Sequence, residues 1–389
     1  MKEDWKECKL GEIVEINKNS YSEKENWKFV NYLDTGNITE NKISEIQHIN
    51  LSDEKLPSRA KRKVKNNNIL YSTVRPNQKH FGIIKSFPEN FLVSTGFAVL
   101  DVNEKLANPD FVYYYLIQNE NTESLHAIAE QTTSAYPAIK PSDIANLSIN
   151  LPLLATQQKI ATILSSLDDK IELNNKINDN LEQQAQAIFK SWFVDFEPFG
   201  GKMPEGWKVG KLSDIAEITM GQSPDGKSYN ENGEGTVFYQ GRAEFGTRFP
   251  TRRLFTTEPK RIAKKFDTLM SVRAPVGDTN IANEDCCIGR GLAAIHSKDR
   301  HQSFIHYTVL FLRSKLDVFN GEGTVFGCIN RDALNNMEVI IPSKIDLDKF
   351  EKIVTTMDTD IFNRSEENDR LKNIRDTLLP KLMNGEIEV

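Results

Sequence analysis

One short stretch of the sequence has the spacing of a phosphate-binding loop. Residues 221–228 read "GQSPDGKS", which satisfies the pattern G-x-x-x-x-G-K-[ST]. In a nucleotide hydrolase such a loop opens a helix, because the helix N-terminus faces the anion. Here Ser228 is followed by "YNENGEGTVFYQG", whose three glycines and two asparagines cannot open a helix. We predict a turn-rich connection between strands, and a nucleotide-dependent enzyme stays open only as a third alternative.

No other catalytic signature is present in the sequence. The [DNS]-P-P-[YF] loop and the glycine-rich cofactor loop of a DNA methyltransferase do not occur, and "NPDF" at Asn108 lacks the second proline. The patterns H-x-x-x-H and G-x-S-x-G and a nuclease-like acidic cluster are missing as well. Cys8, Cys286, Cys287 and Cys328 have no C-x-x-C spacing. We therefore expect no catalytic residue, no metal site and no cofactor on this chain.

Basic residues, in contrast, gather in two regions. "SRAKRKVK" and "VRPNQKH" lie within residues 58–80, and "GRAEFGTRFPTRRLF" and "VRAP" lie within residues 241–275. Lysine and arginine on phosphates supply affinity for DNA, while arginine, glutamine and asparagine on base edges supply sequence choice. A solvated charged face is the alternative for any single patch, and its recurrence in both regions argues against that alternative. The candidate DNA-binding residues are Arg59, Lys61, Arg62, Lys63, Arg75, Gln78, Lys79, Arg242, Arg248, Arg252, Arg253 and Arg273.

Length and composition indicate a folded protein of more than one domain. A chain of 389 residues is too long for one ordinary core. Hydrophobic residues make up 39% and charged residues 27%, as in globular proteins. The formal net charge of -6 argues weakly against a surface that binds nucleic acid everywhere, so local patches decide. No apolar run reaches the roughly 18 residues of a membrane helix, and the N-terminus has no signal-peptide core, so we expect a cytoplasmic protein.

The second half of the sequence repeats the first half. "WKECKLGEIVEI" at residues 5–16 returns as "WKVGKLSDIAEI" at residues 207–218, and "VSTGFAVL" at 93–100 returns as "IGRGLAAI" at 288–295. "LYSTVRP" at 70–76 returns loosely as "LMSVRAP" at 269–275. Several such pairs in the same order indicate a duplicated unit of about half the chain. In each unit, alternating apolar runs between Gly, Pro and Asn clusters predict a mixed α/β region, which we call a head.

A long helix is expected to close each unit. From Ile160 and from Phe350, steps of four and three residues land mainly on apolar positions over about four heptads, which is typical of a coiled coil. Each helix has about 35 residues and a length of about 50 Å. A seam that uses Ile163, Ile177 and Ile353 instead is the alternative. The predicted seam residues are Ile160, Leu164, Leu167, Ile171, Asn174, Asn178, Leu181, Ile188, Val354, Met357, Ile361, Arg364, Asn368, Leu371 and Leu378.

Two helices that each follow one head of a duplicated chain most naturally associate across a pseudo-twofold axis. The predicted fold class is therefore α+β, with two duplicated mixed α/β domains separated by two long antiparallel coiled-coil helices. In this arrangement the helix pair is a rigid spacer that holds two reading heads a fixed distance apart.

The helical regions carry a resemblance to a known family. "KIATILSSLDDKIELNNKINDNLEQQAQAIFKSWFVDFEPF" closely resembles the central conserved region of specificity subunits of type I restriction-modification systems, and "LKNIRDTLLPKLMNGEIEV" resembles their C-terminal conserved region. "LPLLATQQKIA" is similar to the Leu-Pro-x-x-x-x-Gln stretch that opens the helix. "MGQSPDG" followed by "FYQG", "LMSVRAPVG" and "GRGLAAI" is similar to the skeleton of a target recognition domain. The second copy departs from this pattern with "PSKIDLDKF", where a glutamine is usual.

The resemblance implies a non-catalytic DNA-recognition subunit whose two target recognition domains each read one half of a bipartite double-stranded target. It implies helices that set the gap and dock two methyltransferase subunits, which bind S-adenosylmethionine, and a restriction subunit that uses ATP. The implied domains are residues 1–150 and 198–340 for target recognition, and residues 151–197 and 341–389 for the conserved helical regions. A scaffold that joins protein partners through its helices, with incidental basic loops, is the alternative from another class.

Overall fold

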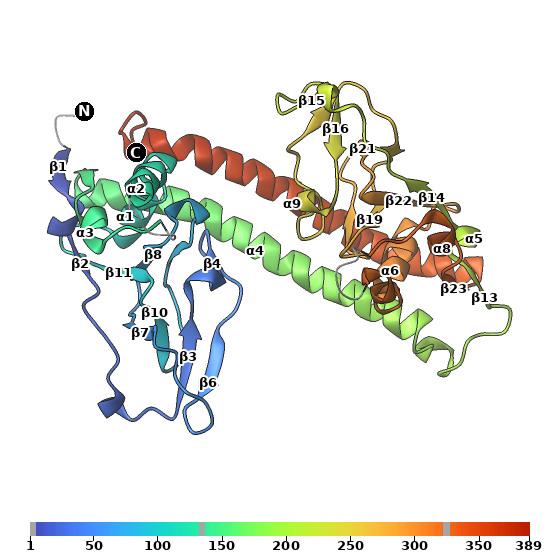
Figure 1. Cartoon of the computed structure of the whole chain (residues 1–389), viewed down its shortest axis with the longest axis horizontal. Coiled ribbons are helices and arrows are strands. Elements are labelled where there is room, and N and C mark those ends of the chain that lie inside the picture. Colours follow the sequence, from blue (N-terminus) through green and yellow to red (C-terminus); the bar gives the residue numbers. More distant parts are fainter. Residues whose placement is uncertain (1–4, 132–136, 322–326) are drawn as a thin grey trace. The chain divides into compact units, whose positions relative to one another are not determined.

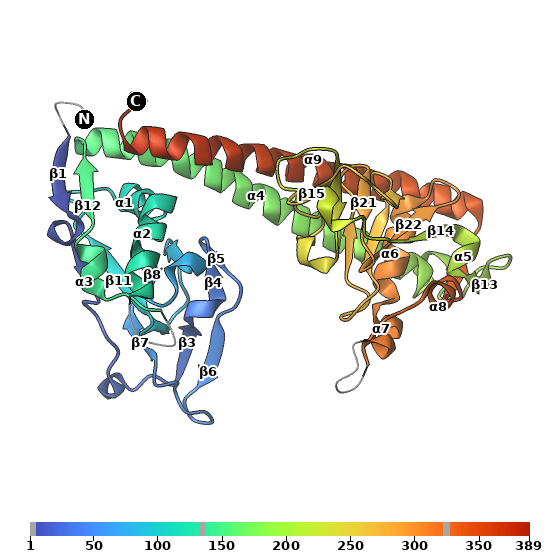
Figure 2. The same ribbon diagram turned by 45° about the horizontal axis from the view of Figure 1, so that its top comes forward.

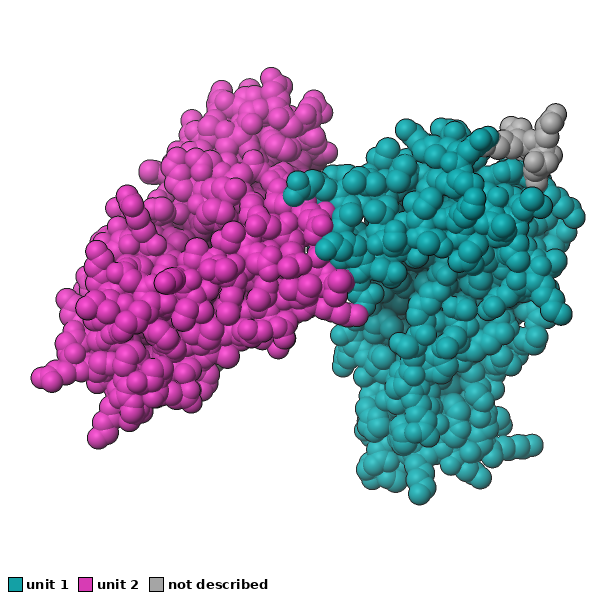
Figure 3. Space-filling model, turned by 180° about the vertical axis from the view of Figure 1, so that it is seen from behind, with its two compact units in different colours: residues 1–172, 368–389 teal, residues 173–367 magenta. Residues whose placement is uncertain are grey.

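The computed structural model describes residues 5–131, 137–321 and 327–389 (Figure 1). The chain divides into two compact units, which Figure 3 colours separately. Unit 1 contains residues 1–172 and 368–389, and unit 2 contains residues 173–367. Each unit therefore combines one head with a stretch of both long helices. The four domain ranges expected from the sequence stay a prediction.

The long helices are α4 (Leu154–Phe193) and α9 (Lys344–Met383), with 40 residues each. At about 1.5 Å per residue, each is about 60 Å long. Within unit 2 they run antiparallel, because Asn174 pairs with Glu367 while Phe193 packs against Phe350. The sequence pattern predicted these helices slightly shorter than they are.

The predicted seam positions are all buried or half-buried in the described structure. In the alternative seam, Ile163 and Ile353 are 36% and 42% exposed, so that alternative is wrong for these two residues. Asn174 is fully buried, donates a hydrogen bond to Glu367 (2.8 Å) and accepts one from Arg364 (3.4 Å). A buried amide left unpaired would cost about 1–3 kcal/mol, so this pairing favours one register of the two helices.

The head of unit 1 is built mainly on two sheets. Its strands are β1 (Lys6–Lys9), β2 (Val14–Ile16), β3 (Phe29–Leu33), β4 (Ile38–Thr39), β5 (Lys42–Ile43), β6 (Gln47–Asn50), β7 (Ala60–Lys63), β8 (Ile69–Ser72), β9 (Phe81–Ile83), β10 (Phe91–Ser94), β11 (Phe97–Val102) and β12 (Ser148–Leu151), and its helices are α1 (Pro109–Leu116), α2 (Asn119–Glu130) and α3 (Pro141–Ala145). The strand orders are β6-β3-β10-β7 and β2-β11-β8-β9, with β1-β12 and β4-β5 as smaller pairs. β10 and most of β11 are buried, which explains why "FLVSTGFAVLDV" is nearly continuously apolar.

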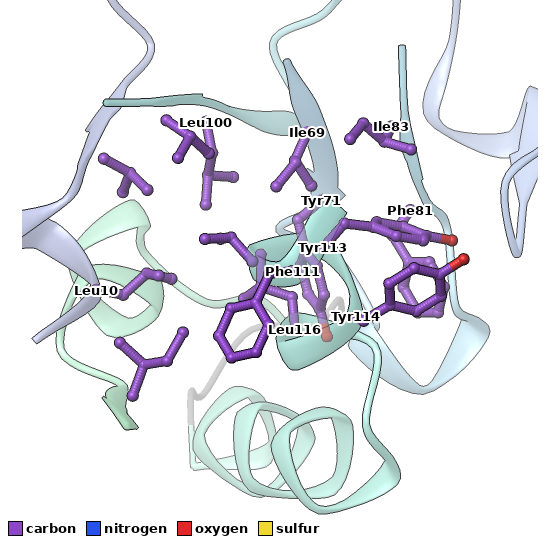
Figure 4. Packing of buried hydrophobic residues seen from close by; sticks show 14 of the residues in the cluster. Leu10, Ile69, Tyr71, Phe81, Ile83, Leu100, Phe111, Tyr113, Tyr114 and Leu116 are labelled. Carbon is purple, nitrogen blue, oxygen red and sulfur yellow. The ribbon is translucent and has the colours of Figure 1, made fainter. Parts of the chain in front are cut away.

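The core of unit 1 joins the head to the long helices. Tyr71 of β8 and Phe111 and Leu116 of α1 lie together in its centre (Figure 4). The same cluster of buried residues contains Leu164 of α4 and Leu382 of α9. Asn108 caps α1 by accepting a hydrogen bond from the Phe111 N–H (3.0 Å), which fixes where this helix begins. The long helices are therefore part of the head's own core.

The head of unit 2 repeats this plan. Its strands are β13 (Lys208–Lys211), β14 (Ala216–Met220), β15 (Tyr229–Asn230), β16 (Thr236–Tyr239), β17 (Phe255–Thr256), β18 (Ile262–Ala263), β19 (Thr268–Ser271), β20 (Thr279–Ile281), β21 (Cys286–Ile288), β22 (Leu292–Ser297) and β23 (Glu338–Ile341), and its helices are α5 (Leu212–Ile215), α6 (Gln302–Phe311), α7 (Arg313–Leu316) and α8 (Arg331–Asn335). Its sheets have the orders β15-β17-β16-β21-β18, β14-β22-β19-β20 and β13-β23. Figure 2 shows β14 and β22 of this head near α9, and buried residues of these two strands and of α9 belong to one cluster.

The strand orders match between the heads. The order β2-β11-β8-β9 corresponds to β14-β22-β19-β20, and β6-β3-β10-β7 corresponds to β17-β16-β21-β18. In both heads one matching pair is parallel, β3 with β10 and β16 with β21, while its neighbours are antiparallel. Matching order and matching direction confirm the duplication that the sequence predicts.

Candidate nucleic-acid interface

In unit 1, the strand ends around the crossover from β10 to β11 come together. The Thr95 N–H donates to the Arg59 carbonyl (2.8 Å), and the Thr73 N–H donates to the Gly96 carbonyl (2.8 Å). A Cβ placed on Gly96 would lie 2.8 Å from Cγ2 of Thr35, so the residues after β3 lie against the same crossover. We call the following residues the head-1 rim: Asp34, Thr35, Arg59, Thr73, Arg75 and Thr95.

In unit 2, the crossover from β21 to β22 gathers the matching strand ends. The Ile288 N–H donates to the Arg261 carbonyl (2.9 Å), and the Val272 N–H donates to the Gly291 carbonyl (2.9 Å). A Cβ on Gly291 would lie 3.0 Å from the Gln240 carbonyl oxygen, so the residue after β16 is in contact with this crossover. We call the following residues the head-2 rim: Gln240, Gly241, Arg261, Arg273 and Arg290.

The two rims carry arginines at partly different positions. Val74 and Arg273 match, because each forms an isolated bridge, with Ala138 and with Cys328 respectively. The predicted candidate Arg75 therefore corresponds to Ala274 and not to Arg273.

One pair of arginines does match between the two heads. Val93 pairs with Arg62 of β7, and the matching Ile288 donates its N–H to the carbonyl of Arg261, which directly precedes β18, so Arg62 and Arg261 occupy the same position. Arg261 lies in the basic region of the second head but is missing from the candidate set, which contains its counterpart Arg62.

Five of the predicted DNA-binding side chains are paired with carboxylates of their own head. The ion pairs are Lys63–Glu25, Lys79–Glu40, Arg242–Asp278, Arg252–Glu284 and Arg253–Glu244. An exposed ion pair contributes at most about 1 kcal/mol, so a DNA phosphate can compete for a cation such as Arg242. Arg253 and Arg252 are held more firmly, because Glu244 is buried and Arg252 also contacts Glu366 of α9. Arg59, Lys61 and Arg273 are exposed and form no ion pair within the described residues.

The other predicted candidates of unit 1 lie on β7 and after β8. Arg62 is half-buried on β7, and its burial lowers the pKa of the guanidinium. Arg75 adopts a left-handed conformation (φ 47°) just before the short turn Pro76–Gln78. Gln78 at the end of this turn is exposed. The turn therefore presents Gln78 beside the rim residue Arg75.

Arg248 does not lie on the surface of the head. Its side chain is buried, and its guanidinium contacts Glu182 of α4, Asp358 of α9 and the Tyr307 hydroxyl of α6 (3.2 Å). The neighbouring Phe249 packs edge-on against Phe362 of α9, with ring centroids 5.5 Å apart. The prediction that Arg248 contacts DNA is therefore wrong, because carboxylates on both helices hold its donors inside the unit.

A corresponding polar cluster joins the head of unit 1 to the same two helices. The Tyr114 hydroxyl donates to Asp168 (2.6 Å), and Arg375 of α9 contacts that carboxylate at 2.7 Å. Burial and the Asp168 charge raise the pKa of Tyr114, so its hydroxyl stays protonated and donates. Tyr114 and Asp168 match Tyr307 and Asp358 of unit 2, where the hydroxyl donates over 2.9 Å.

The two heads differ in the side chain by which the N-terminal part of a long helix, α4 in unit 1 and α9 in unit 2, accepts hydrogen bonds from the head. In unit 1 the buried Gln157 accepts a hydrogen bond from the Asn108 N–H (2.8 Å). In unit 2, whose sequence departs from the family pattern here, Glu351 accepts the Ser303 N–H (2.9 Å) at the start of α6. Burial raises the pKa of Glu351, more than its backbone hydrogen bonds lower it. Each acceptor thus ties the start of a head helix to a long helix, although Gln157 and Glu351 stand at different positions of the repeat and accept from different N–H groups.

The phosphate-loop match is a connection between strands. It follows β14 and leads through the turn Gly226–Ser228 into β15, and Ser228 is buried with its hydroxyl 2.7 Å from that of Thr256. The strand after Ser228 leaves no helix N-terminus for a phosphate. Among the described residues there is no cluster of histidine, cysteine and carboxylate side chains that could hold a metal ion. No helix in the described part of the chain is long and apolar enough to cross a membrane.

Two matching heads with cationic rims, held on long helices, are the features of a DNA-recognition subunit. The sequence matches the family "Type I restriction modification DNA specificity domain" twice, over residues 2–183 and 204–373. The chain belongs to this family. The resemblance in the helical regions, the duplicated fold class and the DNA-specificity function are thereby confirmed, and the scaffold alternative is not favoured.

Individual relatives cover nearly the whole chain. The sequence is 30% identical to the type I restriction enzyme HindI specificity subunit of Haemophilus influenzae, over 99% of this chain and 100% of that protein. It is 31% identical to the putative type I restriction enzyme MjaX specificity subunit of Methanocaldococcus jannaschii, over 100% of this chain and 94% of that protein. The crystal structure of the type I restriction-modification system S subunit from M. genitalium shares the fold, with a TM-score of 0.60, 17% identity, and coverage of 97% of this chain and 96% of that one.

Proposed function

We propose that each rim of this specificity subunit reads one half of a bipartite double-stranded DNA target. The observation that carries the proposal is the recurrence of a cationic rim at the same crossover in two heads with matching strand order. Exposed arginines such as Arg59 and Arg261 supply phosphate contacts and place the rim on the duplex. The side chains between them then read the edges of the bases.

The chemistry of the complex belongs to partner subunits in this proposal. Two methyltransferase subunits dock on the helices and bind S-adenosylmethionine, and a restriction subunit uses ATP. This chain selects the target, catalyses no step and acts in the cytoplasm with the DNA. The lack of a catalytic signature in its sequence supports this division of roles.

The helix pair sets the distance between the two half-sites in this proposal. Each long helix is continuous over 40 residues, and its polar seam residues are paired with specific partners. Continuous helices with a specified register form a stiff element, which is the property that a spacer requires.

The affinity of the full-length chain for DNA should fall steeply with salt. Each phosphate contact contributes about 0.9 to the slope of log K against log salt concentration. Fluorescence anisotropy with labelled duplexes of different sequence, over a series of salt concentrations, measures both this slope and the sequence preference. Equal affinity for every duplex at every salt concentration would contradict the proposed function.

A further inference from the structure

Gln240 occupies the centre of the head-2 rim. It follows β16, which Figure 1 shows beside β21, and its side chain is exposed whereas the preceding Tyr239 is fully buried. Within the described residues its side-chain amide forms no hydrogen bond. A Cβ on Gly289 would lie 2.7 Å from the Gln240 carbonyl oxygen, and one on Gly291 would lie 3.0 Å from it. The residues packed against Gln240 are thus glycines, because the Gln240 backbone fills the place that their Cβ atoms would take.

Three arginines lie on segments that meet at the same crossover as this glutamine. Arg290 lies between the two glycines, Arg273 follows the strand segment hydrogen-bonded to Gly291, and the Arg261 carbonyl accepts the Ile288 N–H. All three side chains are exposed and form no ion pair within the described residues. These three exposed arginines are suited to bind phosphates, while the neutral amide of Gln240 is suited to face a base.

Asp34 is the matching residue of the head-1 rim. It follows β3 as Gln240 follows β16, and Leu33 pairs with Val93 as Tyr239 pairs with Ile288 in the two parallel strand pairs. The Tyr32 hydroxyl (3.0 Å) and the Thr35 N–H (2.8 Å) both donate to Oδ1 of Asp34. These bonds orient the carboxylate.

Asp34 is a hydrogen-bond acceptor at neutral pH. Burial alone would raise its pKa, but hydrogen bonds from the Thr35 N–H, Ser94 and Tyr32, together with the nearby Arg59 charge, place that pKa below its usual value. An ionised carboxylate has no donor, so it can recognise only a donor on a base.

We propose that Gln240 recognises adenine in the half-site of unit 2 and that Asp34 recognises cytosine in the half-site of unit 1. This inference rests on the proposed function. A glutamine amide matches N6 and N7 of adenine with one donor and one acceptor, and a carboxylate accepts a hydrogen bond from the N4 amino group of cytosine. The two rims therefore choose different bases at corresponding positions, although their strands match.

Reciprocal substitutions test this pair of residues. The full-length wild-type chain and the variants Gln240→Glu, Asp34→Asn and Gln240→Ala each select duplexes from a randomised library, and the selected pools are sequenced. Gln240→Glu should change one preferred adenine to cytosine in one half-site, and Asp34→Asn should change one preferred cytosine to adenine in the other half-site. Gln240→Ala should lower the preference for adenine over the other bases, at the base pair that Gln240 recognises, by roughly tenfold to a hundredfold. Gln183→Ala on the exposed face of α4 is the matched control and should leave every position unchanged.

The outcomes separate this inference from the proposed function. If wild type selects a bipartite target and the three variants select the same target with the same discrimination, the base assignments are overturned while the proposed function stands. If a substitution changes both half-sites together, the assignment of one residue to one half-site is overturned. If wild type selects no sequence at all, the proposed function and this inference fall together. Circular dichroism and thermal unfolding of each variant show that a change in preference does not come from a misfolded head.

Discussion

Both units fasten a head to the helix pair through a tyrosine, an aspartate and an arginine, but the arginine comes from different elements. In unit 1 it is Arg375 of α9, whereas in unit 2 it is Arg248 of the head itself. The α4 residue that matches Arg375 in the repeat is Ala185, which is buried and carries no charge. The duplicated plan therefore keeps an arginine beside the aspartate in both units, while the element that supplies this arginine differs. A consequence is that the loop around Arg248 is tied directly to both helices in unit 2.

The largest effect is expected from removing the arginine of unit 2. Arg248→Met leaves Glu182 and Asp358 without their cation, and breaking a buried pair of this kind costs about 3–5 kcal/mol. The matching change Arg375→Met should cost roughly half as much, because exposed pairs contribute less, and the Arg375 side chain is 26% exposed against 9% for Arg248. Hydrogen–deuterium exchange of the amides in α6 and α1 measures both losses in the full-length chain.

The control for this comparison is Arg273→Ala, an exposed arginine of the same head without an ion pair in the described structure. It should leave exchange in α6 unchanged. If Arg248→Met and Arg375→Met each accelerated hydrogen–deuterium exchange equally in α1 and in α6, the effect of each cluster would not be local to its own unit.

The next largest effect is expected from lengthening the helix pair. Inserting four residues after Asn178 and four after Arg364 adds about one turn, or about 6 Å, to both helices. If the helix pair sets the gap, the preferred gap should change by about two base pairs, since base pairs rise by about 3.4 Å. Selection from a library with variable gaps measures this shift. An unchanged gap would contradict the spacer role. The control is the insertion in α4 alone, which shifts the pairing register of α4 against α9.

The smallest effect concerns pH and the two helix starts. The pKa of Glu351 is raised in the folded chain, so its contribution to stability is complete below the ordinary pKa of a glutamate and is lost as the pH rises through the raised value. Exchange at the start of α6, corrected for intrinsic rates, should therefore be slower at about pH 5 than at about pH 7.5. The start of α1, where the neutral Gln157 is the acceptor, lacks this contribution. Glu351→Gln should flatten the pH dependence of α6, and an unaltered profile would contradict the role given to Glu351.

The sequence predicted the parts of the structure that depend on periodicity and repetition. The repeat of "WKECKLGEIVEI" and the four-three steps from Ile160 indicated duplicated heads and long helices, because such patterns reflect burial on one face. The place of Arg248 could not be predicted in this way, since its partners Glu182 and Asp358 lie far from it in the sequence and no local pattern connects them. The contact of Gln240 with the glycines of the crossover follows only from the parallel pairing of β16 with β21.

The most direct test of two independent rims compares Arg59→Ala and Arg261→Ala on three duplexes. One duplex carries the full target, and in each of the others one half-site is scrambled. Each substitution should weaken binding to the full target several-fold and lower the slope of log K against log salt concentration by about one. Each should lose part of its effect only on the duplex in which its own half-site is scrambled. Losses that are the same on all three duplexes for both substitutions would contradict the claim that each rim reads its own half of the target.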